Sequence, residues 1–265
     1  MIYLWLSMLQ ATCPTLTVVK HPAVQPKKLN EISGIALSHK HIWVHNDSGD
    51  EARIFKLSSN GTLLQTKSFP GLKAIDWEDM TINHQNDQLF IADTGDNRER
   101  RKELFIHSYE LKSEKLSSFP ITLPNGSRDI EGIAFDPLSD NLFLLSKGRK
   151  GTVYLYKLDL NNPSPTIVHH YPISAQEGLN PERITAMDIS PDGSWIATRN
   201  YMEIFLYKRG STQTVATAMK EPPCIFASPA QKQGESIAFS TDGKSLYTIS
   251  EGEHAPIYEL RLMQP

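Results

Sequence analysis

Five segments of the sequence repeat one pattern, in which a small or acidic residue precedes a short apolar run, a turn and a second apolar run. The repeats begin at Ser33, Glu78, Glu131, Thr185 and Glu235. A period of about 40–50 residues built from short strands is typical of a β-propeller, in which four-stranded sheets surround one axis. The repeat therefore predicts an all-β fold of similar sheets arranged in a ring.

Each repeat continues into further runs with the composition of strands. A third run such as "VYLYKLDL" follows in every unit, and a fourth follows in the first four units: "GTLLQTKSF", "SSFPITL", "PTIVHHYPI" and, less clearly, "TVATAM". Val, Ile, Tyr and Phe dominate these runs, and Gly, Pro, Asn and Asp separate them. We expect four strands per sheet.

The fifth unit stops after its third run, so one outer strand is missing. The segment "LTVVKH", residues 16–21, is unassigned and can supply it from the other end of the chain. Such closure removes an open sheet edge that would otherwise invite aggregation. The sequence predicts a single domain over residues 16–265, a five-bladed β-propeller whose last blade is closed by an N-terminal strand. A six-bladed ring is the alternative, if one weak repeat is hidden.

The first 15 residues indicate export. An apolar run followed by small residues is typical of a secretory signal, although the usual basic residues do not precede it. We expect a periplasmic or secreted protein, with a lipid anchor on Cys13 as the less favoured alternative. Two cysteines are too few for a disulfide framework, so Cys224 is expected to be a lone buried thiol.

Charge and hydropathy restrict the partners. The net charge is −3, and neither a basic groove nor an apolar run of about 18 residues occurs. We therefore expect no nucleic-acid partner and no membrane span. The expected protein is a monomer that binds a small anionic or phosphorylated ligand.

Acidic residues recur where the first strand of a repeat starts and where the second strand ends. These two points are antiparallel neighbours, so they lie at the same end of the sheet. The topology gathers the following residues around one mouth of the central channel: Glu31, Asp76, Glu78, Asp129, Glu131 and Glu235 from first strands, and Asp47, Asp93, Lys147, Arg199 and Glu251 from second strands.

Crowded carboxylates stay ionised only when something compensates their charge. Protonation, neutralisation by Lys147 and Arg199, or a bound metal ion can each do so. Ligand sets made only of oxygen favour a hard cation, Ca²⁺ first and Mg²⁺ as the alternative. The structural interpretation is that such acids accept backbone N–H groups, and Asp47 and Asp93 have the sequence surroundings of turn-forming aspartates.

The motifs "DWEDM", "IADTGDNR", "EISGIA" and "ESIAFS" resemble those of exported bacterial propellers. The similar families are the phytase-like group with esterase-like activity and the SdiA-regulated propellers, and the resemblance spans residues 30–255. It implies a calcium-binding propeller that acts as a phosphoester or ester hydrolase. The acids that match are Asp76, Glu78, Asp93, Glu131 and Glu235.

Two hypotheses of function follow. In the first, a metal ion held by these five acids activates a water molecule. Glu31 or Asp47 then accepts the proton, and Lys147 and Arg199 stabilise negative charge on a phosphoryl oxygen. In the second, the same mouth binds an anionic ligand or a partner protein without catalysis, and the calcium is structural.

Overall fold

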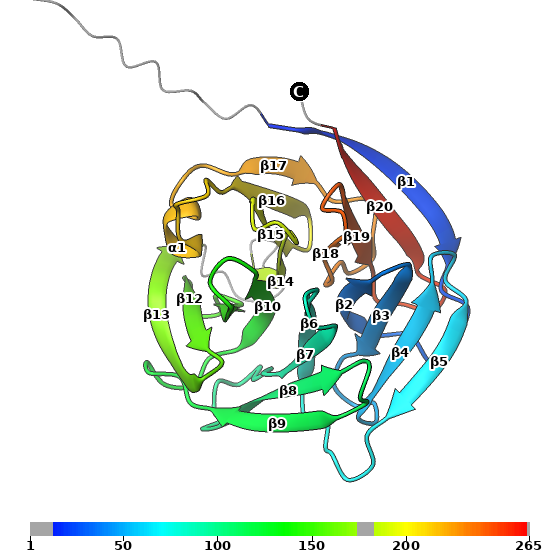
Figure 1. Cartoon of the computed structure of the whole chain (residues 1–265), viewed down its shortest axis with the longest axis horizontal. Coiled ribbons are helices and arrows are strands. Elements are labelled where there is room, and N and C mark those ends of the chain that lie inside the picture. The colour runs from blue at the N-terminus through cyan, green and yellow to red at the C-terminus, as the bar shows by residue number, and fades with distance from the viewer. Residues whose placement is uncertain (1–12, 174–182, 264–265) are drawn as a thin grey trace, which may run out of the picture.

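The computed structural model describes residues 13–173 and 183–263, and it confirms the five-bladed propeller. Five four-stranded antiparallel sheets form a ring (Figure 1). In chain order the strands of the first three blades are β2 (Ile32–Ser38), β3 (His41–Asn46), β4 (Arg53–Ser58) and β5 (Leu63–Ser68); β6 (Trp77–Asn83), β7 (Gln88–Asp93), β8 (Leu104–Glu110) and β9 (Leu116–Ile121); β10 (Ile130–Asp136), β11 (Asn141–Ser146), β12 (Thr152–Asp159) and β13 (Asn162–Pro172).

The last two blades complete the ring. Blade 4 contains β14 (Ile184–Ile189), β15 (Trp195–Asn200), β16 (Glu203–Lys208) and β17 (Cys224–Ala227). Blade 5 contains β18 (Ala238–Phe239), β19 (Ser245–Ile249) and β20 (Pro256–Met263), and its outer strand is β1 (Thr15–Ala23). β1 pairs with β20 in antiparallel register, Thr15 opposite Met263 and Lys20 opposite Tyr258. The expected closure by the N-terminal strand is therefore confirmed.

The core is divided into five hydrophobic clusters, one between each pair of neighbouring blades. Alternation along the strands produces this division, because successive side chains point to opposite faces of a sheet. In β3, Ile42 and Val44 pack toward blade 5, whereas Trp43 between them packs toward blade 2. First strands are covered on both faces, so β2, β6 and β10 are buried along their whole length.

One expected strand is a helix. The run "TVATAM" forms α1 (Val215–Ala218), and the fourth strand of blade 4 is instead β17, several residues later. The Thr214 hydroxyl accepts the backbone N–H of Thr217 and caps the helix. Val215 and Ala218 pack between blades 3 and 4. No described helix is long and apolar enough to cross a membrane.

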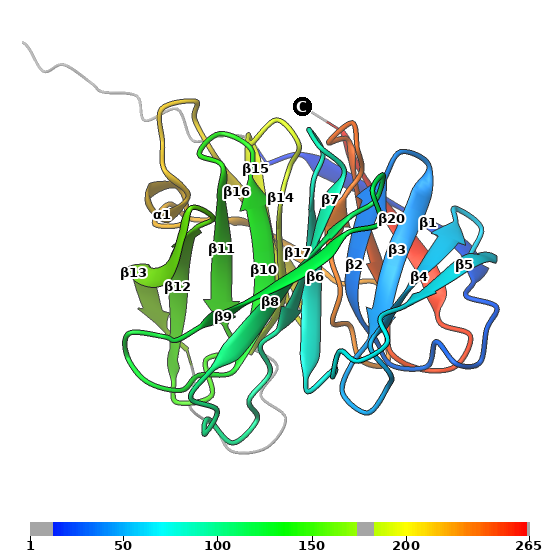
Figure 2. The same cartoon turned by 60° about the horizontal axis from the view of Figure 1, so that its bottom comes forward.

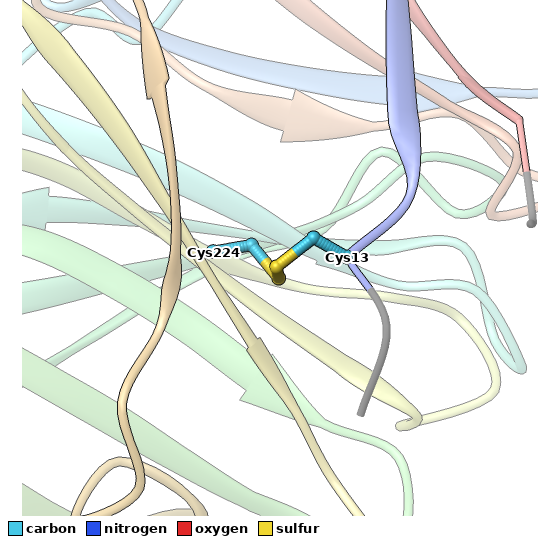
Figure 3. Close-up of a disulfide and its surroundings, with 2 residues drawn as sticks. All are labelled: Cys13 and Cys224. Carbon is cyan, nitrogen blue, oxygen red and sulfur yellow. A yellow bond between two sulfur atoms is a disulfide. The ribbon is translucent and has the colours of Figure 1, made fainter. Parts of the chain in front are cut away.

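The expectation of a lone Cys224 thiol is wrong. Cys13 and Cys224 form a disulfide that joins the segment before β1 to β17, the outer strand of the neighbouring blade (Figure 3). The spacing argument failed because two cysteines 211 residues apart in the sequence meet only when the ring closes. The disulfide also occupies the thiol that a lipid anchor on Cys13 would need. The expected signal segment otherwise lies in residues 1–12, outside the described residues.

Hydrogen bonds cross the axis of the ring between inner strands. Asp79 of β6 accepts the backbone N–H groups of Ile133 in blade 3 (3.0 Å) and Met187 in blade 4 (3.2 Å). Asp188 of β14 accepts the Phe239 N–H in blade 5 (2.7 Å) and the Thr81 hydroxyl in blade 2 (3.2 Å). Side-chain acceptors thus tie the inner strands of four blades to one another. Figure 2 shows three of these inner strands, β6, β10 and β14, with the ring turned by 60° from the view of Figure 1.

Candidate metal centre

The same kind of backbone hydrogen bond recurs at one end of four blades. It joins the residues after the second strand to those before or at the start of the first strand. The bonds run from Asp47 N to Glu31 O (2.8 Å), Gly95 N to Asp76 O (3.0 Å), Lys147 N to Asp129 O (2.9 Å) and Glu251 N to Gln233 O (3.0 Å). This pairing brings acidic residues from separate repeats to one end of the ring.

Seven carboxylates meet there, and we call them the acidic rim: Asp47, Asp76, Glu78, Asp129, Glu131, Glu235 and Glu251. They form three overlapping groups in which one oxygen of each member lies within 4.8 Å of the others: Asp47 with Glu235 and Glu251, Asp47 with Asp76 and Glu78, and Glu78 with Asp129 and Glu131. Asp47 and Glu78 each belong to two groups. The rim therefore draws on blades 1, 2, 3 and 5.

The two carboxylates of blade 3 are already neutralised. The Lys147 ammonium lies 2.7 Å from a Glu131 oxygen and is 7% exposed, and Arg149 pairs with Asp129. Burial by itself lowers the pKa of Lys147, but Glu131 and then Tyr201 and Glu78 outweigh it and hold this pKa well above its usual range. This part of the acidic rim carries its own counter-charges.

The other five carboxylates have no such partner. Within residues 13–173 and 183–263, no ion pair links Asp47, Asp76, Glu78, Glu235 or Glu251 to a lysine, arginine or histidine. Glu78 is the most informative of them, because it is only 4% exposed and yet forms no ion pair with a described lysine, arginine or histidine. We call Asp47, Asp76 and Glu78 the acid-only group.

Gly95 leaves space for two members of this group. A Cβ atom on Gly95 would lie 2.0 Å from Glu78 Oε1 and 2.5 Å from Asp76 Oδ2. Any side chain at position 95 would therefore displace the carboxylates. The lack of a side chain at Gly95 is a geometric requirement of the acid-only group.

Burial and mutual repulsion raise the pKa values of the acidic rim. Burial, followed by the charge of Glu235, raises the pKa of Asp47 to about 7. Burial and then Glu131 raise the pKa of Glu78 well above its usual range. Burial and a shared hydrogen bond with Glu235 raise the pKa of Glu251 to about 9. These shifts are what crowded carboxylates show when protons are their only compensation.

Two of the residues expected at this site have other surroundings. Asp93 accepts the backbone N–H groups of Ile75 and Asp76 and pairs with Arg101. Arg199 is fully buried, and its guanidinium donates to Gln231, Ser236 O, Thr248 and Ser228 at the interface of blades 4 and 5. Glu31 is exposed at the edge of the acidic rim.

The acidic rim also includes two residues that sequence reasoning placed at this end without choosing them as ligands. Asp129 stands two residues before Glu131, as Asp76 does before Glu78. Glu251 follows β19, the second strand of blade 5, as Asp47 follows β3 in blade 1. That repeat correspondence was the available signal. The sequence pattern gave no sign of Tyr201, whose ring centroid lies 6.0 Å from the Lys147 ammonium.

The fold and this end of the ring define the chain as a five-bladed propeller with an acidic rim. It belongs to the SdiA-regulated family, whose model matches residues 16–193. No curated protein sequence matches the chain.

Solved structures share the fold at low sequence identity. The PQQ-bound aldose sugar dehydrogenase of Streptomyces coelicolor is 13% identical, with a TM-score of 0.53 over 94% of this chain and 99% of that chain. A gluconolactonase of Xanthomonas campestris is 10% identical, with a TM-score of 0.50 over 87% of this chain and 72% of that one. At these identities the likeness is one of fold alone.

Proposed function

We propose that this protein binds a divalent cation at the acid-only group, Ca²⁺ first and Mg²⁺ as the alternative. One observation carries the proposal: Glu78 is buried against Asp47 and Asp76, and no cationic side chain in the described part of the chain forms an ion pair with it. Burying an uncompensated carboxylate is costly, and a cation offsets that cost directly. Asp47 comes from blade 1 and the other two residues from blade 2, so the cation would join two blades.

The chemistry of the site suits a hard cation. All three ligands offer carboxylate oxygens, and Glu235, a close neighbour of Asp47, offers a fourth. Ca²⁺ accepts six to eight oxygens in flexible geometry, so water or a ligand would fill the remaining positions. Glu131, expected from the sequence as a ligand, serves in this proposal as the partner of Lys147.

Calorimetric titration with Ca²⁺ tests the proposal. Wild-type protein should bind Ca²⁺, and Glu78→Gln should weaken binding at least tenfold because the buried charge is lost. Gly95→Ala should weaken it comparably by steric displacement without changing any charge. Glu253→Gln, an exposed acid two residues from Glu251, is the control and should bind as wild type does.

The absence of a titration heat with both Ca²⁺ and Mg²⁺ would overturn the proposal, provided that the melting temperature of the protein is also unchanged by either cation. A tight site in wild type that survives unchanged in both Glu78→Gln and Gly95→Ala would place the cation elsewhere.

A hydrolase acting on phosphoesters or esters is the activity that the same end of the ring favours. The supporting observation is the Lys147 ammonium, which pairs with Glu131, a neighbour of Glu78 of the acid-only group. A bound cation would supply an activated water, and Glu31 could accept its proton, because Asp47 serves as a cation ligand in this proposal. Lys147 is the group that could stabilise negative charge on a substrate oxygen. Because the Arg199 guanidinium is occupied between blades 4 and 5, we give it no part in this step.

Incubating the protein with a panel of phosphoesters and carboxylic esters, with Ca²⁺ or with chelator, tests this activity. A hydrolase should show turnover that chelator removes and that Glu131→Gln lowers at least tenfold by disturbing Lys147. If Ca²⁺ binds but no panel member turns over, the binding alternative is favoured, in which the rim holds an anionic ligand or a partner protein.

The disulfide supports the export of this protein from the cytoplasm. Cys13–Cys224 is the kind of bond that persists in oxidising compartments. We therefore propose a periplasmic or secreted location.

A further inference from the structure

The loop between β7 and β8 holds the acid-only group in place, and the inference drawn from it rests on the proposed cation site. We define the clamp loop as residues 94–101, "TGDNRERR". It begins directly after Asp93 at the end of β7. It contains most of the sequence motif "IADTGDNR", but none of its residues is a proposed ligand of the cation.

The clamp loop is bonded to the start of the first strand in two blades. In blade 2, Gly95 N donates to Asp76 O (3.0 Å). In blade 3, Thr94 Oγ1 donates to Ile130 O (2.9 Å), and Asp96 N donates to Asp129 Oδ1 (2.8 Å). One loop thus touches both chain segments that carry acidic-rim residues.

Asp93 fixes the backbone from which Asp76 projects. Its two carboxylate oxygens accept Ile75 N and Asp76 N, each at 3.1 Å. Asp93 is 1% exposed, and burial would raise its pKa, but His107, Arg101 and the two amides outweigh burial and lower it. Its oxygens are therefore directed at protein donors.

Arg101 connects Asp93 to the clamp loop. One guanidinium nitrogen, Nη1, donates to Gly95 O (2.7 Å), and the other, Nη2, donates to Asp93 Oδ1 (2.9 Å) and to Asp93 O (3.1 Å). Its own backbone N–H donates to Asp96 Oδ2 (2.6 Å). The side chain thereby fixes Gly95, whose missing Cβ gives Glu78 and Asp76 their space.

We infer that Asp93 and Arg101 are positioning residues for the cation site: they hold Asp76 and Gly95 in the arrangement that binds the cation, and neither contacts it. This assigns Asp93 a different part from the ligand role that the sequence suggested.

The sign of one measurement separates positioning from simple electrostatics. Burial and then Asp129 raise the pKa of Asp76, and the nearby positive charge of Arg101 offsets part of that rise. Charge alone therefore predicts that removing Arg101 strengthens cation binding, because a repulsive neighbour is lost. Positioning predicts the opposite, because Asp76 and Gly95 lose their anchor.

The experiment is calorimetric titration of the full chain with Ca²⁺, comparing Arg101→Gln with Arg100→Gln. Arg100 is the adjacent, exposed arginine, so its replacement removes the same charge from the same loop. We expect Ca²⁺ binding at least tenfold weaker in Arg101→Gln and within twofold of wild type in Arg100→Gln. Arg101→Lys keeps the charge but loses the two-nitrogen geometry, and it should weaken binding as Arg101→Gln does.

Melting temperatures in chelator show that each variant is folded. If wild type binds Ca²⁺ and Arg101→Gln binds it equally or more tightly, the positioning inference is overturned while the proposed cation site stands. If wild type binds neither Ca²⁺ nor Mg²⁺, the proposed function fails, and the inference fails with it. Full rescue in Arg101→Lys would also overturn it, since charge would then suffice.

Discussion

At the scale of single residues, buried carboxylates near the axis carry a measurable dependence on pH. Asp188 accepts hydrogen bonds from Phe239 N and the Thr81 hydroxyl, but burial is the stronger influence and raises its pKa to about 7. An unfolded aspartate has its pKa near 3.8. Because the folded value is the higher one, the contribution to stability is present below about pH 4 and is lost as pH rises through about 7.

Asp188→Asn should therefore flatten the pH dependence of stability. Between pH 5 and pH 8, wild type should lose on the order of 2 kcal/mol more unfolding free energy than the variant, because this window covers only part of the interval between the unfolded and folded pKa values. Denaturant unfolding at the two pH values measures this difference. Asp140→Asn, at an exposed turn position, is the control. Equal pH slopes in wild type and Asp188→Asn would contradict the assignment.

At the scale of elements, residue composition was enough to predict a strand wherever a run alternates between apolar and polar residues or is wholly apolar. The first strands β6 and β10 lie where the repeat placed them, and the outer strand β1 was expected over residues 16–21 and extends over Thr15–Ala23. The run "TVATAM" was assigned wrongly because Thr-Val-Ala-Thr fits both a short strand and a capped turn of helix. The Thr214 cap and the packing of Val215 and Ala218 decided in favour of α1.

At the scale of the whole molecule, the ring is closed twice. β1 pairs with β20 inside blade 5, and the disulfide ties the segment before β1 to β17 in blade 4. Both ends of the described chain are thereby held at one junction, and outward separation of blades 4 and 5 is resisted by a covalent bond. A cross-link between residues so distant in sequence restricts the unfolded chain strongly.

Removing the disulfide should therefore lower stability. We expect Cys13→Ser with Cys224→Ser to lose about 2–4 kcal/mol of unfolding free energy. Guanidinium unfolding with and without a thiol reductant measures this loss. Reductant should move the wild-type midpoint to that of the double variant and leave the double variant unchanged. Coincident midpoints for oxidised wild type and the double variant would contradict a stabilising part for the bond.

The sequence by itself determined the ring, its closing strand and the end at which acids collect. A repeat fixes which face and which end each equivalent residue occupies, because strand alternation and antiparallel pairing leave little freedom. Tertiary structure decided how the acids are compensated. Lys147 and Arg149 neutralise the rim carboxylates of blade 3, Arg101 pairs with Asp93, and Glu78 forms no ion pair within residues 13–173 and 183–263. The ion pairs Glu131–Lys147, Asp129–Arg149 and Asp93–Arg101 each lie within one blade and depend on side-chain distances of a few ångströms. The disulfide joins two residues of different blades that are 211 positions apart. No local pattern encodes either, because side-chain distances follow from the packed structure and the disulfide forms only when the ring has closed.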